Sequence, residues 1–267
     1  MRECYRHPGR ETGVSCSSCD RPICPDCMTP TPVGMRCPEC SKQRTRVVNM
    51  REATNTPVVT VGLIAANVAV YLIASLSSGG LASGGSGTLM QRGKLYGPAV
   101  SIGGEWWRII TSGFLHAGML HLLMNMLFIW LLGSQLEPAL GRARFASLYF
   151  VSLLCGSLGS LLIQPDVPVV GASGAAFGLL GAAIVMARRR RVDLMATGLL
   201  PILLINLVFT FTIPGIAIGG HLGGVVGGFI AGWTLEEIEE KSGRTAALIA
   251  TAAIGVAVFG LALMAAG

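Results

Sequence analysis

Three short stretches of this chain place polar side chains within otherwise apolar sequence. They are residues 121–125 (HLLMN), 171–174 (GASG) and 220–224 (GHLGG). Each lies near the end of a segment long enough to cross a bilayer, where serine and histidine side chains are costly and need an explanation. A serine hydroxyl becomes a strong nucleophile when a histidine accepts its proton. The stretches therefore predict a hydrolytic site within a membrane, with Ser173 as nucleophile and His221 as base.

His121 and Asn125 complete this predicted site. They stand four residues apart, so they share one face of a helix and can point at one spot. Acyl transfer needs hydrogen-bond donors aimed at the oxyanion that forms during attack. We expect the His121 imidazole, the Asn125 amide and the Ser173 backbone N–H to supply them. The alternative for each residue is structural, because serines, polar pairs and glycine stripes in membrane helices commonly serve packing alone.

The composition indicates a polytopic all-α membrane protein. The chain has 267 residues, 52% hydrophobic and 13% charged, whereas a soluble domain carries about 25% charged residues. A helix needs about 20 apolar residues to cross about 30 Å of hydrocarbon. Seven segments approach this length: residues 57–76, 115–133, 145–163, 171–187, 194–212, 215–234 and 246–266.

The basic residues predict an orientation. They follow the second, fourth and sixth segments, on the same side as the N-terminal region, and the positive-inside rule makes that side cytoplasmic. The first apolar run begins near Pro57 and no secretory signal precedes it. We therefore expect a multi-pass plasma-membrane protein with a cytoplasmic N-terminus and with Ser173 and His221 near the outer face.

The net charge of +6 has no accompanying aromatic-rich basic face, which argues against nucleic acid as a partner.

The N-terminal region predicts a small zinc-binding domain at residues 1–40, joined by a basic linker at 41–56. Two-residue gaps let both ligands of a pair reach one tetrahedral Zn²⁺, and four pairs complete two closed, structural sites. A disulfide-rich head is the alternative, which a cytoplasmic location disfavours. The spacing resembles a B-box or other cross-braced finger, which implies that the first pair joins the third and the second joins the fourth. The predicted ligands are Cys4, His7, Cys16, Cys19, Cys24, Cys27, Cys37 and Cys40.

Four motifs in order resemble the rhomboid intramembrane serine proteases over about residues 57–234. They are Trp107-Arg108, His121-x-x-x-Asn125, Gly-x-Ser-Gly at 171–174 and His221-x-x-Gly224. The resemblance implies a six-helix bundle, with a polar loop and a seventh transmembrane helix added at 235–267.

The resemblance also implies roles for single residues. Ser173 and His221 form a dyad that needs no cofactor, and His121 and Asn125 form the oxyanion hole. Phe177, one turn after the serine, stacks on the dyad histidine. Trp107, Arg108 and Gly171 support the site. Substrates enter past a gate in the fifth span formed by Leu207, Val208, Phe209 and Phe211.

Two functions follow from this sequence. The favoured one is a serine endopeptidase that cleaves transmembrane segments of other membrane proteins near the outer face. The alternative is a non-catalytic scaffold in the lipid bilayer, whose zinc-binding head recruits a cytoplasmic protein. Scaffolds of this kind normally lose the serine or the histidine, and both are present here. A metalloprotease or zinc transporter is disfavoured because no His-Glu-x-x-His motif occurs.

Overall fold

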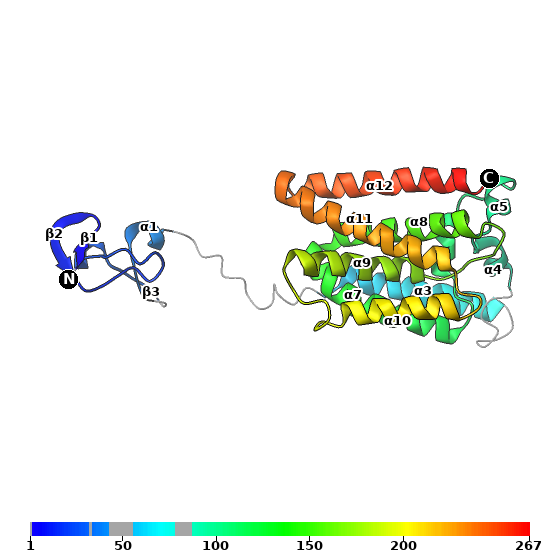
Figure 1. The fold of residues 1–267 in the computed structure, drawn as a ribbon, viewed down its shortest axis with the longest axis horizontal. Coiled ribbons are helices and arrows are strands. Elements are labelled where there is room, and N and C mark those ends of the chain that lie inside the picture. The colour runs from blue at the N-terminus through cyan, green and yellow to red at the C-terminus, as the bar shows by residue number, and fades with distance from the viewer. Residues whose placement is uncertain (1, 32–33, 43–55, 78–86) are drawn as a thin grey trace. The chain divides into compact units, whose positions relative to one another are not determined.

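The computed structural model describes residues 2–31, 34–42, 56–77 and 87–267. The chain divides into two compact units, Met1–Thr54 and Asn55–Gly267 (Figure 1). Most of the predicted linker at 41–56 and of the Ser/Gly-rich segment at 77–88 lies outside the described residues. The boundaries of the predicted domains stay predictions.

In its described residues the N-terminal unit contains two antiparallel strand pairs and two short helical turns, elements that the spacing of the ligand pairs does not predict. Each turn begins with a proline directly after a cysteine, a position where the missing proline N–H costs no hydrogen bond. Cysteines and Ile23 form its small buried core. The elements are β1 (Arg2–Cys4) with β2 (His7–Thr12), β3 (Thr29–Thr31) with β4 (Gly34–Arg36), η1 (Pro25–Cys27) and α1 (Pro38–Ser41).

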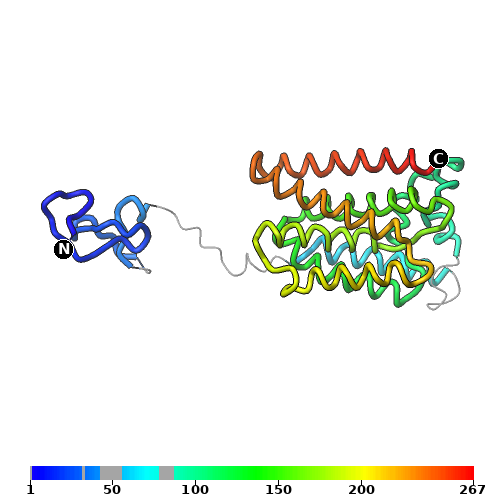
Figure 2. Tube along the Cα trace, in the orientation of Figure 1, coloured from blue at the N-terminus to red at the C-terminus, as the bar shows by residue number. Residues whose placement is uncertain are grey.

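Seven long helices lie within the described residues of the second unit, which confirms the prediction of an all-α polytopic membrane protein with six helices and an added seventh (Figure 2). Five helices of the described residues are long and apolar enough to span a membrane, namely α3, α7, α8, α11 and α12. The other two, α9 and α10, have 17 and 14 residues. The helices are α3 (Val58–Ser77), α7 (Met119–Leu140), α8 (Arg142–Ile163), α9 (Ser173–Arg189), α10 (Leu199–Thr212), α11 (Ile218–Ser242) and α12 (Arg244–Ala265).

Trp107 and Arg108 organise the long loop between α3 and α7. Arg108 is only 7% exposed and forms an ion pair with Glu105. Its guanidinium also donates hydrogen bonds of 2.8 Å to the backbone oxygens of Gln91 and Lys94, and the Trp107 indole donates to the Arg92 carbonyl. These bonds tie the start of α6 (Arg108–Thr111) to the end of α4 (Thr88–Gly93). The same loop also contains α5 (Gly97–Ser101) and η2 (Ser112–Phe114).

Helices α8, α9 and α11 pack at backbone contact through their glycines. A Cβ built on Gly228 of α11 would fall on the backbone of Gly178 in α9, and one on Gly224 would fall on Gly174. Between α8 and α11, a Cβ on Gly159 or on Gly219 would meet the other residue's backbone carbonyl. Small residues allow such close approach, which maximises dispersion contacts between helices in lipid.

The opposite ends of α9 and α11 are joined by ion pairs. Arg189 at the end of α9 pairs with Glu236, Glu237 and Glu240 of α11. Arg144 of α8 pairs with Glu239. These partners explain why α11 continues as a helix to Ser242, beyond the predicted end of the sixth span at residue 234.

We expect Gly228→Ala to lower the free energy of unfolding by about 1–3 kcal/mol, because the added methyl group would force α9 and α11 apart. Denaturation in detergent, followed by tryptophan fluorescence, would measure the loss. Gly260→Ala on α12 is the matched control, since a Cβ there meets nothing within 4 Å. Equal stability of the two variants would contradict the packing argument.

Candidate active site and metal-binding clusters

One cavity of about 610 Å³ gathers the four predicted catalytic side chains from three helices. His121 and Asn125 come from α7, Ser173 from α9 and His221 from α11, and Asn206 of α10 and the loop at 214–217 complete the wall. Much of the remaining lining is apolar, including Met124, Phe128, Val170, Phe177, Leu180 and Ile216. The structure thus brings together side chains that are up to 100 positions apart in the sequence.

Gly171 allows Ser173 and the His121 ring to lie near each other. Ser173 is the first residue of α9, and Gly171 just before it has a φ of +129°, which side-chain-bearing residues rarely adopt. A Cβ on Gly171 would lie 2.8 Å from two atoms of the His121 ring. The Gly171 N–H donates to the Ser112 carbonyl at 2.9 Å, which fixes the turn.

Asn125 is 5% exposed and lies one helical turn beyond His121. Its Nδ2 donates to the His121 carbonyl at 2.9 Å. An amide nitrogen carries two hydrogens, so the second N–H remains available to a group in the cavity. His116 is 1% exposed and packs edge-to-face against His121 with the ring centroids 5.1 Å apart.

The His221 ring is held on its face and on one edge. Phe177 stacks on it with centroids 4.0 Å apart and planes 18° from parallel, as the resemblance implied. Its Nδ1 lies 2.7 Å from the hydroxyl of Thr210 on α10. We did not single out Thr210 from the sequence, because a threonine within an apolar run gives no signal of its own. Among the described residues, no direct hydrogen bond joins the Ser173 hydroxyl to His221.

The N-terminal unit contains two four-ligand clusters that can each hold a metal ion. The first cluster is Cys4, His7, Cys24 and Cys27, and the second cluster is Cys16, Cys19, Cys37 and Cys40. Within each cluster the ligand atoms all lie within 4.8 Å of one another. The first ligand pair therefore joins the third and the second joins the fourth, the cross-braced arrangement that the B-box resemblance implied. Sulfur-rich sets of four match the preference of structural zinc.

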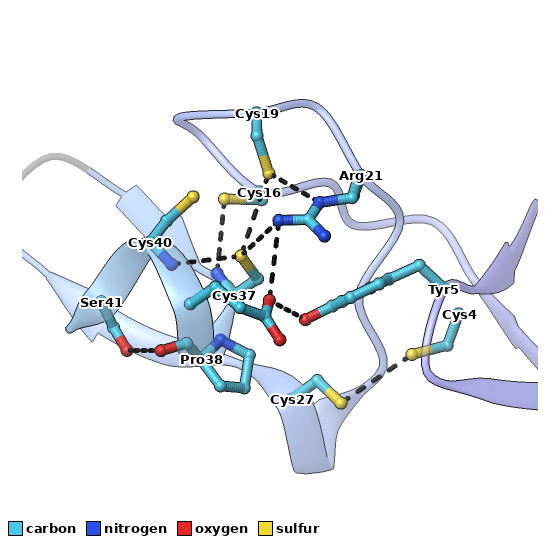
Figure 3. Close-up of polar contacts among 11 residues, drawn as sticks. Cys4, Tyr5, Cys16, Cys19, Arg21, Cys27, Cys37, Pro38, Cys40 and Ser41 are labelled. Atoms are coloured by element: carbon cyan, nitrogen blue, oxygen red, sulfur yellow. Dashed lines mark hydrogen bonds and ion pairs between the residues drawn. The ribbon is translucent and has the colours of Figure 1, made fainter. Parts of the chain in front are cut away.

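Local hydrogen bonds stabilise the thiolate forms of Cys16 and Cys19 in the second cluster (Figure 3). The backbone N–H of Cys37 points at the Cys16 sulfur at 3.3 Å and lowers the pKa of Cys16 to about 6. The Arg21 guanidinium donates to the Cys19 sulfur at 3.2 Å and lowers the pKa of Cys19. Arg21 is itself held over the Tyr5 ring, 4.6 Å from its centroid. Thiolates are the forms that bind metal, so these contacts favour metal uptake.

Residues 103–238, about half of the chain, match the family model for the rhomboid domain. The chain belongs to the rhomboid family. The matched residues include every side chain of the cavity discussed above and exclude both metal-binding clusters.

Several curated rhomboid-family proteins are similar to this chain. Rhomboid protease GluP of Bacillus subtilis is 39% identical over 131 residues, which cover 48% of this chain and 26% of GluP. Putative rhomboid protease YdcA of the same organism is 36% identical over 143 residues, covering 52% of this chain and 71% of YdcA. Inactive RHOMBOID-like protein 8 of Arabidopsis thaliana is 36% identical over 108 residues, covering 40% and 31%. The family therefore includes proteases and an inactive member.

We expect purified protein to carry two zinc ions per chain, and Cys24→Ser and Cys37→Ser each to lose one of them, because each removes one ligand from one cluster. Elemental analysis of the purified variants would measure the metal content. Cys155→Ser, in the bundle and outside both clusters, should retain both ions. A metal content near zero in the unaltered protein would rule out the zinc assignment.

Proposed function

We propose that this rhomboid-family chain is an intramembrane serine endopeptidase that cleaves transmembrane segments of other membrane proteins. The observation that carries the proposal is the cavity shared by Ser173, His221, His121 and Asn125. The names of GluP and YdcA as rhomboid proteases add support.

The proposed reaction proceeds through an acyl-enzyme. Ser173 Oγ attacks the peptide carbonyl carbon while the free ring nitrogen of His221 takes the hydroxyl proton. The carbonyl oxygen becomes an oxyanion, stabilised by His121, the second N–H of Asn125 and the Ser173 backbone N–H. His221 then gives the proton to the leaving amine, and water releases the acyl group by the same steps. In resting enzymes such hydrogen bonds are often long and tighten when substrate binds, so the lack of a Ser173–His221 hydrogen bond among the described residues is compatible with this role.

The cavity wall suits an unwound, apolar substrate segment. Met124, Phe128 and Leu180 offer apolar contacts, whereas a peptide bond in an intact helix is shielded by its own hydrogen bonds. Substrates with helix-weakening residues near the cleavage point are therefore favoured. We place substrate access beside α10, where Val208, Phe209 and Phe211 are 50–60% exposed.

We further propose a plasma-membrane location with the active site near the outer face and the N-terminus in the cytoplasm. In support, α7, α9 and α11 each begin at the catalytic side chains, while Arg144, Arg189 and Arg244 lie toward the other end with their acidic partners. The positive-inside rule makes that end cytoplasmic. The N-terminal unit would then be a zinc-stabilised cytoplasmic module that is available to a protein partner.

A serine-reactive fluorophosphonate should label the detergent-solubilised protein, and Ser173→Ala and His221→Ala should both abolish labelling because each removes half of the dyad. Gel fluorescence measures this. Ser152→Ala is the matched control: Ser152 is also buried in the bundle, but its hydroxyl bonds the Leu148 carbonyl. Absent labelling of well-folded unaltered protein would favour the non-catalytic scaffold.

Asn125→Ala should slow cleavage of a transmembrane substrate about 100-fold or more, as loss of an oxyanion donor does. Initial rates on a reconstituted substrate would show this. Gln135→Ala provides the control, because Gln135 makes the same bond to the carbonyl four residues earlier on the same helix, away from the cavity. Unchanged turnover in Asn125→Ala would remove Asn125 from the oxyanion hole.

A further inference from the structure

Thr210 makes two short polar contacts at the edge of the active-site histidine. Its Oγ1 lies 2.7 Å from His221 Nδ1 and 2.7 Å from the backbone oxygen of Asn206, one turn earlier on α10. A hydroxyl has one hydrogen to donate. The Asn206 carbonyl can only accept, so both contacts are hydrogen bonds only if Thr210 donates to that carbonyl and accepts from a protonated Nδ1.

We propose that Thr210 is a positioning residue that selects the tautomer of His221, an inference that rests on the proposed function. With the hydrogen held on Nδ1, the other ring nitrogen, Nε2, carries the lone pair. That nitrogen is the one left to accept the proton of Ser173. The opposite tautomer would present an N–H to the serine and could not act as its base.

Phe177 and Thr210 restrict different motions of the same ring. Stacking on Phe177, with a 4.0 Å centroid separation, limits tilting of the imidazole plane. It does not prevent the ring from turning over within the stack, which would exchange the positions of its nitrogen and carbon atoms. The hydrogen bond to Thr210 favours one of the two orientations, because only a nitrogen at that edge satisfies it.

The same contact helps during proton transfer. When His221 takes the serine proton it becomes an imidazolium, and its Nδ1–H bond to Thr210 becomes charge-assisted and stronger. The Thr210 oxygen is the better acceptor because its own hydrogen is engaged with Asn206. A neutral hydroxyl thus performs the orienting task that a carboxylate performs in serine-histidine-aspartate triads, without placing a third charge in the membrane.

Thr210 also ties the base to α10, a helix with few buried residues. Of the 14 residues of α10, only Leu203 and Thr210 are buried, and Thr210 is 1% exposed. A displacement of α10 large enough to separate Thr210 from His221 would break this hydrogen bond and leave the edge of the His221 ring unheld. The orientation of the base therefore depends on the position of α10.

Thr210→Val removes the hydroxyl while keeping the shape of the side chain. We expect kcat on a reconstituted transmembrane substrate to fall roughly 10-fold to 100-fold, the range for losing a hydrogen bond to a charged group, with KM nearly unchanged. Thr210→Ser restores the hydroxyl and should return most of the rate. Thr212→Val is the matched control, since Thr212 bonds the carbonyl four residues earlier on the same helix but is exposed.

Nitrogen NMR of protein labelled with 15N-histidine reads the tautomer directly, with the His221 signal identified by its loss in His221→Gln. We expect the Nδ1-protonated form in the unaltered protein and a shift toward the Nε2-protonated form in Thr210→Val. An Nε2-protonated ring in the unaltered protein would overturn the proposal even if Thr210→Val failed to fold. Full turnover in a folded Thr210→Val would also overturn it, whereas an unaltered protein without Ser173 labelling would instead refute the proposed function.

Discussion

Backbone contact between glycine faces is the constraint on which the arrangement of the proposed catalytic side chains depends. Gly174 lies one residue after Ser173, and its backbone meets Gly224, which lies three residues after His221. Helices in lipid gain little from the hydrophobic effect when they associate, so close packing and internal polar contacts must hold them. Side chains at these glycines would separate α9 from α11 and would move the serine away from the histidine.

Two polar residues at the site, Asn125 and Thr210, are hydrogen-bonded to the backbone of their own helices. Asn125 bonds the carbonyl one turn earlier, and Thr210 does the same while also accepting from His221. Such local bonds reduce the cost of placing polar groups in hydrocarbon. The His221 ring is oriented by its stacking on Phe177 and by its contact with Thr210 on another helix. The second N–H of Asn125 and the other ring nitrogen of His221 are the groups left available for the proposed chemistry.

The two units of the chain are stabilised by different physical means. The N-terminal unit buries mainly cysteines with Ile23, too small an apolar core to offset the entropy of folding, and its cross-braced clusters can supply the difference by binding metal. The bundle, by contrast, has an extensive apolar core and ion pairs joining its helix ends. Metal loss in the first unit therefore need not disturb packing in the second.

The sequence by itself determined what depends on local spacing. Apolar segment length predicted the seven helices, the four-residue interval placed His121 and Asn125 on one face, and two-residue gaps identified the ligand pairs. Tertiary structure alone decided which distant groups meet. The partnership of Thr210 with His221, the bonds of Arg108 to loop carbonyls and the fit of Gly171 against His121 all cross between elements. The periodicity of apolar residues shows only which side chains share a face of one helix. These contacts depend instead on how closely, and in which register, the helices pack against one another.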